Sequence, residues 1–150
     1  MMPLIFLLTV FVILFGINKF LLKGKLSLSF IGRVSLAVML VATGIAHFVS
    51  TDLMIEMMPE FVPLKREIVY LTGILELLAV VGLLVGRLSK ITAVLLVIFF
   101  AAILPANIIG SLKQVNLGGM ENGAIYLLFR VPLQILFIFW AYYFGVRINK

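Results

Sequence analysis

The chain contains no cysteine, a single histidine and few charged residues. Without cysteine it has no disulfide bond, no thiolate metal site and no dithiol relay of its own. One histidine excludes a haem with two histidine ligands and argues against a metal site. We therefore expect neither a metal nor a haem as cofactor.

Charged residues make up 12% of the 150 residues, whereas 64% are hydrophobic. Soluble domains usually carry about 25% charged residues. A water-soluble fold of this length could not bury so much apolar surface, because a small domain keeps a large surface for its volume. The composition therefore predicts an all-α protein that spans a membrane.

Five apolar stretches predict five transmembrane helices, at about 2–18, 30–49, 68–86, 91–110 and 124–145. Each is close to the roughly 20 residues that cross a bilayer. The first lacks a preceding basic residue and a small-residue cleavage site, so we interpret it as a retained helix rather than a signal peptide. We find no domain linker and expect residues 1–150 to form one membrane domain.

The net charge of +6 comes from basic residues that stand singly at the ends of apolar stretches. This placement is typical of membrane proteins and argues against nucleic acid as a partner. Eight basic residues fall on one side of the membrane, namely Lys19, Lys23, Lys25, Arg33, Arg87, Lys90, Arg147 and Lys150, and four on the other, namely Lys65, Arg66, Lys113 and Arg130. The split predicts an N-terminus outside and a C-terminus in the cytoplasm, in a bacterial inner (cytoplasmic) membrane.

The candidate polar residues inside the predicted spans are His47, Glu76, Asn107, Arg130 and Gln134. At 1.5 Å per residue, Glu76 lies about 13 Å from the outer end of its helix and Arg130 about 10 Å, with His47 and Asn107 about 5 Å in. Side chains lean toward the N-terminus of their own helix, which brings all four groups toward one layer of the outer leaflet. Ionisable groups are costly in lipid, so this layer is the candidate site.

Neighbouring residues support this layer at helical spacing. Thr43 lies four residues before His47, and Thr72 four before Glu76. Pro105 and Pro132 each remove one helical hydrogen bond close to the polar layer, which favours a cavity there. The alternative is that a buried Glu76–Arg130 ion pair only locks the helices together.

Residues 50–67 form a longer connection that Ser50, Thr51 and Asp52 can cap as a short helix and that Pro59 and Pro63 interrupt. Its apolar content is typical of a segment lying on the membrane surface. A lid over the polar layer is the second interpretation of this segment.

The chain resembles the DoxX-like membrane proteins over about residues 33–145. The matching pieces, in order, are Gly44-Ile-Ala-His47-Phe48, Tyr70-Leu-Thr-Gly-Ile-Leu-Glu76-Leu-Leu, Leu104-Pro-Ala-Asn107-Ile, and Arg130-Val-Pro-Leu-Gln134 followed by Trp140-Ala. The resemblance implies a four-helix transmembrane bundle, to which the helix at 2–18 is an addition. It also implies quinone-linked or oxidative-stress roles, often beside soluble enzymes, with the five polar residues as a cluster of unproved role.

Three functions compete. The first is a binding or redox-accessory protein whose pocket in the outer leaflet holds a quinone or another isoprenoid or lipid, beside a soluble or membrane redox partner. The second is an enzyme in which Glu76 and His47 transfer a proton within an apolar substrate. The third is a structural or assembly subunit. Catalysis, the ligand and the oligomeric state, a homo-oligomer included, stay open.

Overall fold

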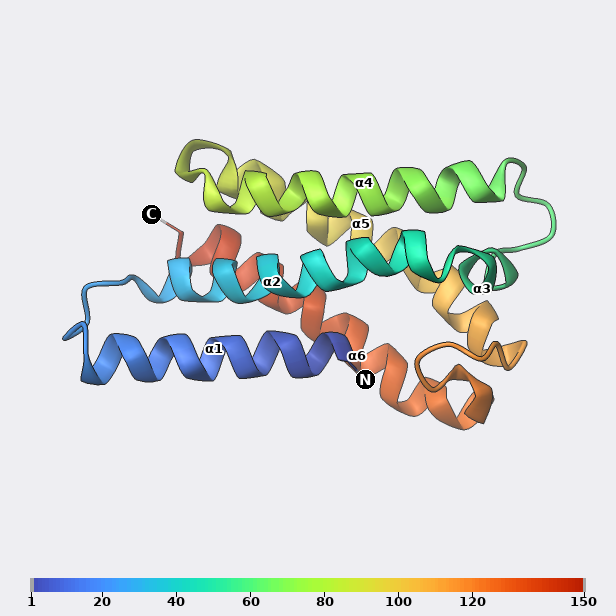
Figure 1. Cartoon of the computed structure of the whole chain (residues 1–150), viewed down its shortest axis with the longest axis horizontal. Coiled ribbons are helices and arrows are strands. Elements are labelled where there is room, and N and C mark those ends of the chain that lie inside the picture. Colours follow the sequence, from blue (N-terminus) through green and yellow to red (C-terminus); the bar gives the residue numbers. More distant parts are fainter. Residues whose placement is uncertain (1, 150) are drawn as a thin grey trace.

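The computed structural model describes residues 2–149, and this part of the chain is helical with no β-strand. The five long helices are α1 (Met2–Phe20), α2 (Leu28–Val49), α4 (Lys65–Leu84), α5 (Gly86–Leu112) and α6 (Ala124–Tyr142). The shorter elements are α3 (Thr51–Glu56), the 3₁₀ helix η1 (Met120–Asn122) and the π-helix η2 (Tyr143–Arg147), which continues α6 (Figure 1). Each long helix is long and apolar enough to cross a membrane.

The long helices correspond to the five predicted stretches, with shifts at their ends that have local causes. α2 begins two residues early because the Ser27 hydroxyl accepts a hydrogen bond from the Phe30 amide and caps the helix. α5 begins at Gly86, five residues before the predicted start at 91, so the predicted gap between the third and fourth stretches is wrong. The turn is the extended residue Val85, and Arg87 and Lys90 lie in the first turns of α5. Both side chains are exposed, as long basic side chains at a membrane edge can be.

Helices α2 and α4 pack closely at two glycines. A Cβ on Gly73 would lie 2.7 Å from the His47 Cβ and 3.2 Å from the Gly44 carbonyl oxygen. A Cβ on Gly44 would lie 2.9 Å from Leu77. Small residues let helix backbones approach in this way inside membranes. The close approach brings the face of α2 that carries His47 against the face of α4 that carries Glu76.

The other end of α2 is joined to the end of α6. The Trp140 indole nitrogen donates to the Gly32 carbonyl (3.0 Å), and the Ser29 hydroxyl donates to the Phe144 carbonyl (2.7 Å). A Cβ on Gly32 would collide with the Phe144 ring. Asn149 lies two residues after the π-helix, and its side-chain amide donates to the Ser89 hydroxyl of α5. These contacts hold α2, α5 and α6 together at the end remote from α3.

Helix α1 lies beside α2 and extends along only part of it, so α1 begins near the middle of α6, where Leu4 shares a small pocket with Phe129, Pro132 and Leu133 (Figure 1). Leu7 is its one fully buried side chain among the described residues, and Phe11 contacts the Trp140 ring edge-to-face at 5.0 Å. Most of its other apolar side chains are exposed, among them Val12 and Ile13. Such a surface is suited to lipid.

The connection after α2 contains the predicted short helix, but its predicted cap is wrong. Ser50 makes no side-chain cap, and the Thr51 hydroxyl instead donates back to the His47 carbonyl at 2.7 Å. The segment then packs inward: Met57 is buried and forms a second apolar cluster with Val115 and Met120. The connection between α5 and α6 therefore packs against the residues that follow α3.

Candidate functional site

A cavity of about 770 Å³ lies between α2, α4, α5 and α6, on the α3 side of the molecule. Its volume lies within the roughly 300–1,000 Å³ that is usual for ligand pockets. The wall is mostly apolar, and its polar members are Thr43, His47, Thr72, Glu76, Asn107, Tyr126, Arg130 and Gln134. The five predicted site residues thus line one cavity, together with both predicted supporting threonines.

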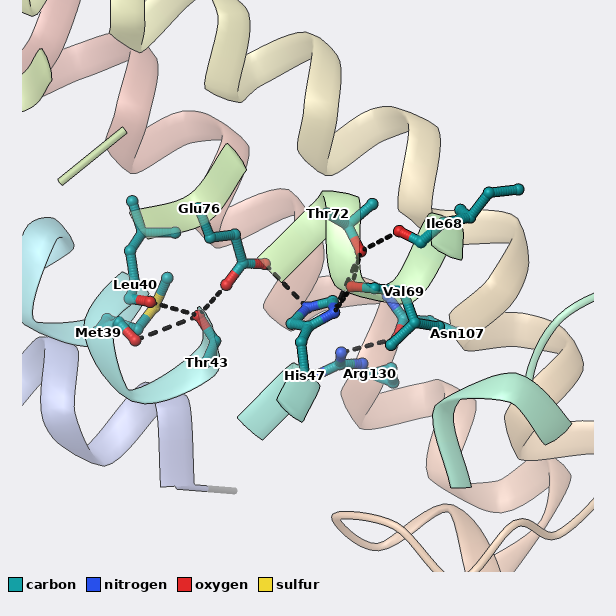
Figure 2. A network of polar contacts seen from close by, with 10 residues as sticks. All are labelled: Met39, Leu40, Thr43, His47, Ile68, Val69, Thr72, Glu76, Asn107 and Arg130. Atoms are coloured by element: carbon teal, nitrogen blue, oxygen red, sulfur yellow. Dashed lines mark hydrogen bonds and ion pairs between the residues drawn. The ribbon is translucent and has the colours of Figure 1, made fainter. Parts of the chain in front are cut away.

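Glu76 is held on both of its oxygens by groups from α2. The Thr43 hydroxyl lies against Oε2, and the His47 Nε2 lies 3.5 Å from Oε1 (Figure 2). Glu76 is 4% exposed, so its carboxyl group depends on these protein partners rather than on solvent. The Thr43–Glu76 and His47–Glu76 contacts are possible because the two helices meet at Gly44 and Gly73.

The imidazole of His47 is oriented by α4. Its Nδ1 lies 3.0 Å from the Val69 carbonyl oxygen and 3.1 Å from the Thr72 hydroxyl oxygen (Figure 2). Nδ1 can donate to the Val69 carbonyl or accept from the Thr72 hydroxyl, depending on the tautomer of the ring. The Thr72 hydroxyl is also within reach of the carbonyls of Ile68 and Val69.

The contact gives the pair an acid–base geometry. Nε2 of His47 faces Oε1 of Glu76 across 3.5 Å, so a hydrogen on either group can point at an atom that accepts it. The two groups can therefore exchange one proton along the Nε2···Oε1 direction.

Arg130 lies on α6 and meets α5. Its Nη2 donates to the Asn107 Oδ1 at 2.8 Å (Figure 2). Two donors of this pair, the Arg130 Nε and the Asn107 Nδ2, are buried without a hydrogen-bond partner. Asn107 is 3% exposed. An unsatisfied buried donor costs about 1–3 kcal/mol, and more when it is charged. The wall of the cavity thus offers two adjacent donors that no protein oxygen uses.

The alternative of a Glu76–Arg130 ion pair is wrong. Among residues 2–149, no carboxylate lies within 4.0 Å of Arg130, and the basic partner of Glu76 is His47. The reason is the order of the helices: α4 packs on α2 and α5, whereas α6 packs on α5. Glu76 therefore meets a residue of α2, and Arg130 meets a residue of α5. The polar layer consists of two separate pairs across one cavity.

Gln134 lines the cavity, whereas the two prolines predicted to support it lie outside its wall. Gln134 is fully buried, lines the cavity and donates to the Phe100 carbonyl of α5 at 2.7 Å. Pro105 and Pro132 lie inside α5 and α6, but both are exposed and neither lines this cavity. Gln134 therefore ties α6 to α5, while a direct contribution of the prolines to the wall is not observed.

Sequence reasoning missed several residues of the wall. Tyr126 is buried, lies four residues before Arg130 and donates its hydroxyl to the Gly118 carbonyl at 2.7 Å. Its spacing from Arg130 is the signal that could have found it. Methionines from the segment that follows α2 also line the cavity, as do residues at the start of α1: Met54, Met57, Met58, Met2, Pro3 and Phe6.

Comparison with known proteins identifies the family of this chain. The family described as "Domain of unknown function (DUF8561)" matches residues 36–145, which covers most of α2 and all of α3 to α6. The chain belongs to this family. The match includes the five predicted site residues and leaves α1 outside it. No curated protein and no solved structure matches the chain.

Proposed function

We propose that this protein binds a quinone or a similar lipid in its cavity and serves as an accessory to a redox partner in the membrane. The observation that carries the proposal is the pair of buried, unpartnered donors on Asn107 and Arg130 in a large, mostly apolar cavity. An apolar ligand with an oxygen acceptor satisfies both features, because its body fills the apolar space and its oxygen accepts from the donors. A carbonyl oxygen of a quinone is such an acceptor.

Access from the lipid supports a membrane-resident ligand. Two cavity-lining side chains, Phe6 of α1 and Leu75 of α4, are also 37% and 45% exposed on the outside of the helices. The cavity therefore reaches the surface that faces lipid. The His47–Glu76 pair lies in the same wall and can hold or release a proton beside a ligand whose reduction consumes protons.

The proposal includes a DoxX-like arrangement. In it, α2, α4, α5 and α6 form a four-helix bundle, and α1 is an addition that packs on α2. The match of the family to residues 36–145, without α1, favours this division.

The ligand can be tested on purified protein. Apolar extraction and mass spectrometry of the protein in a mild neutral detergent should recover one lipid or quinone in near-stoichiometric amount. Asn107→Leu and Arg130→Met should each retain about tenfold less, since each removes a donor to the ligand. Arg87→Met is the matched control: it removes an exposed basic side chain away from the cavity and should retain the ligand fully.

Full retention by both cavity variants would contradict the proposal. Recovery of no lipid from the wild-type protein would favour a structural or assembly subunit.

An enzyme is the second candidate, because the His47–Glu76 pair is an acid–base pair within the wall of a cavity. In that case the extracted lipid should occur as substrate and a product that differs from it by the position of a hydrogen. His47→Gln protein should then contain the substrate alone. A single lipid species in both proteins supports the binding function.

The proposed orientation places the N-terminus outside and the C-terminus in the cytoplasm, so that the cavity lies in the outer leaflet. Single-cysteine labelling is direct because the chain has no cysteine. In intact cells, Lys113→Cys should react with a membrane-impermeant thiol reagent, and Lys90→Cys should be protected. Both side chains are exposed in the structure, so accessibility depends on the side of the membrane. The reverse labelling pattern would show that the orientation is inverted.

A further inference from the structure

Arg130 lies in the wall of the cavity without a carboxylate partner. The ionisable wall residues are His47, Glu76, Tyr126 and Arg130. Glu76 is paired with His47 across the cavity, and the Tyr126 hydroxyl donates to the Gly118 carbonyl. Arg130 is always protonated. Among the described residues, no carboxylate lies within 4.0 Å of its guanidinium group.

A lone buried cation is unfavourable in a membrane protein. Such groups are usually paired with an opposite charge or lie in a water-filled space. Asn107 offers Arg130 a neutral oxygen, which satisfies one donor and leaves the charge. The buried donors without a partner, Arg130 Nε and Asn107 Nδ2, belong to side chains that are hydrogen-bonded to each other, so they lie in the same part of the wall.

We infer that the ligand is a monoanionic, single-chain lipid, a long-chain carboxylate, whose two oxygens accept from Arg130 Nε and Asn107 Nδ2. This inference rests on the proposed function and narrows its ligand class. A carboxylate supplies one negative charge and two oxygens, which match a guanidinium group without a carboxylate partner and two buried donors without a hydrogen-bond partner. Its chain fits the apolar part of the wall, which includes Phe99, Phe100, Ile103 and Phe137.

The test compares probes that differ in head-group charge. Purified full-length protein in neutral detergent is titrated with radiolabelled palmitate, with methyl palmitate and with a short-chain ubiquinone. Palmitate should bind saturably and at least about tenfold more tightly than its methyl ester, because the ester keeps the chain and lacks the charge.

The variants locate the charge. Arg130→Gln should remove the preference for palmitate over the ester. Arg130→Lys should keep part of it, since it preserves the charge but not the Nε donor. Arg87→Gln should behave as wild type. If Arg130→Gln does not fold, the comparison of palmitate with its ester on the wild-type protein decides the matter alone.

The outcomes separate the two proposals. Equal binding of palmitate and its ester, or tighter binding of ubiquinone than of palmitate, would overturn the carboxylate and leave the lipid- or quinone-binding function standing. Saturable binding of none of the three probes, together with no co-purified lipid, would overturn both.

Discussion

Replacing His47 with leucine should destabilise the protein strongly, because it leaves the Glu76 carboxyl group buried with Thr43 as its remaining side-chain partner. Leaving a buried polar group without its partner costs about 1–3 kcal/mol, and more when the group is charged, whereas replacing both partners with apolar residues can be nearly neutral. We therefore expect the midpoint of thermal unfolding to fall sharply in His47→Leu. It should recover most of the loss in the double variant His47→Leu with Glu76→Leu.

The control for this prediction is the other ion pair of the described chain. Arg66 donates to Asp52 at 2.6 Å, and both side chains are exposed. Exposed pairs contribute little to stability because water and salt screen them. Asp52→Leu should therefore leave the unfolding midpoint nearly unchanged. A double variant no more stable than His47→Leu alone would mean that the two side chains do not act as a pair.

The five helices could be predicted from the sequence because an apolar stretch of about 20 residues has few other solutions in a membrane. The ends were harder, and the α4–α5 turn shows why. The fourth stretch was predicted to begin at 91, yet Arg87 and Lys90 already lie in α5 with exposed side chains. A basic residue at a membrane edge marks the interface, and it can stand in a helix or in a loop there.

The members of the polar layer could be predicted, whereas their partners could not. Depth along a helix follows from 1.5 Å per residue, so residues of equal depth can be grouped before the structure is known. The rotation of each helix and its neighbours do not follow from depth. Glu76 and Arg130 were paired by their charges, but α4 contacts α2 through Gly44 and Gly73, and α6 contacts α5.

The part of the cavity wall that α1 supplies could not be predicted from the sequence either. Met2, Pro3 and Phe6 line the cavity because α1 lies beside α2 and begins near the middle of α6 (Figure 1). Where an added helix packs depends on tertiary contacts such as that of Phe11 with Trp140, for which the hydrophobic pattern of α1 contains no signal.

The contact of α2 with α4 should be the most sensitive position in the fold, and Gly73→Val tests it. A Cβ at this position meets the His47 Cβ at 2.7 Å and the Gly44 carbonyl at 3.2 Å, and neither atom can rotate away. The two helices must separate to make room for the side chain, and such overpacking costs about 1–3 kcal/mol. The separation also weakens the His47–Glu76 contact. We expect a lower unfolding midpoint and loss of the co-purified lipid.

Gly16→Val is the matched control, since Gly16 also lies inside a long helix but has nothing within 4 Å of an added Cβ. Gly16→Val makes the same chemical change as Gly73→Val and has the same effect on helix propensity, but its side chain displaces no neighbouring helix. Gly16→Val should keep both the midpoint and the lipid. If Gly73→Val matches it in both measurements, the close approach at Gly73 does not hold the site together. If Gly73→Val loses stability and keeps the lipid, the Arg130–Asn107 side of the cavity binds the ligand independently of α2 and α4.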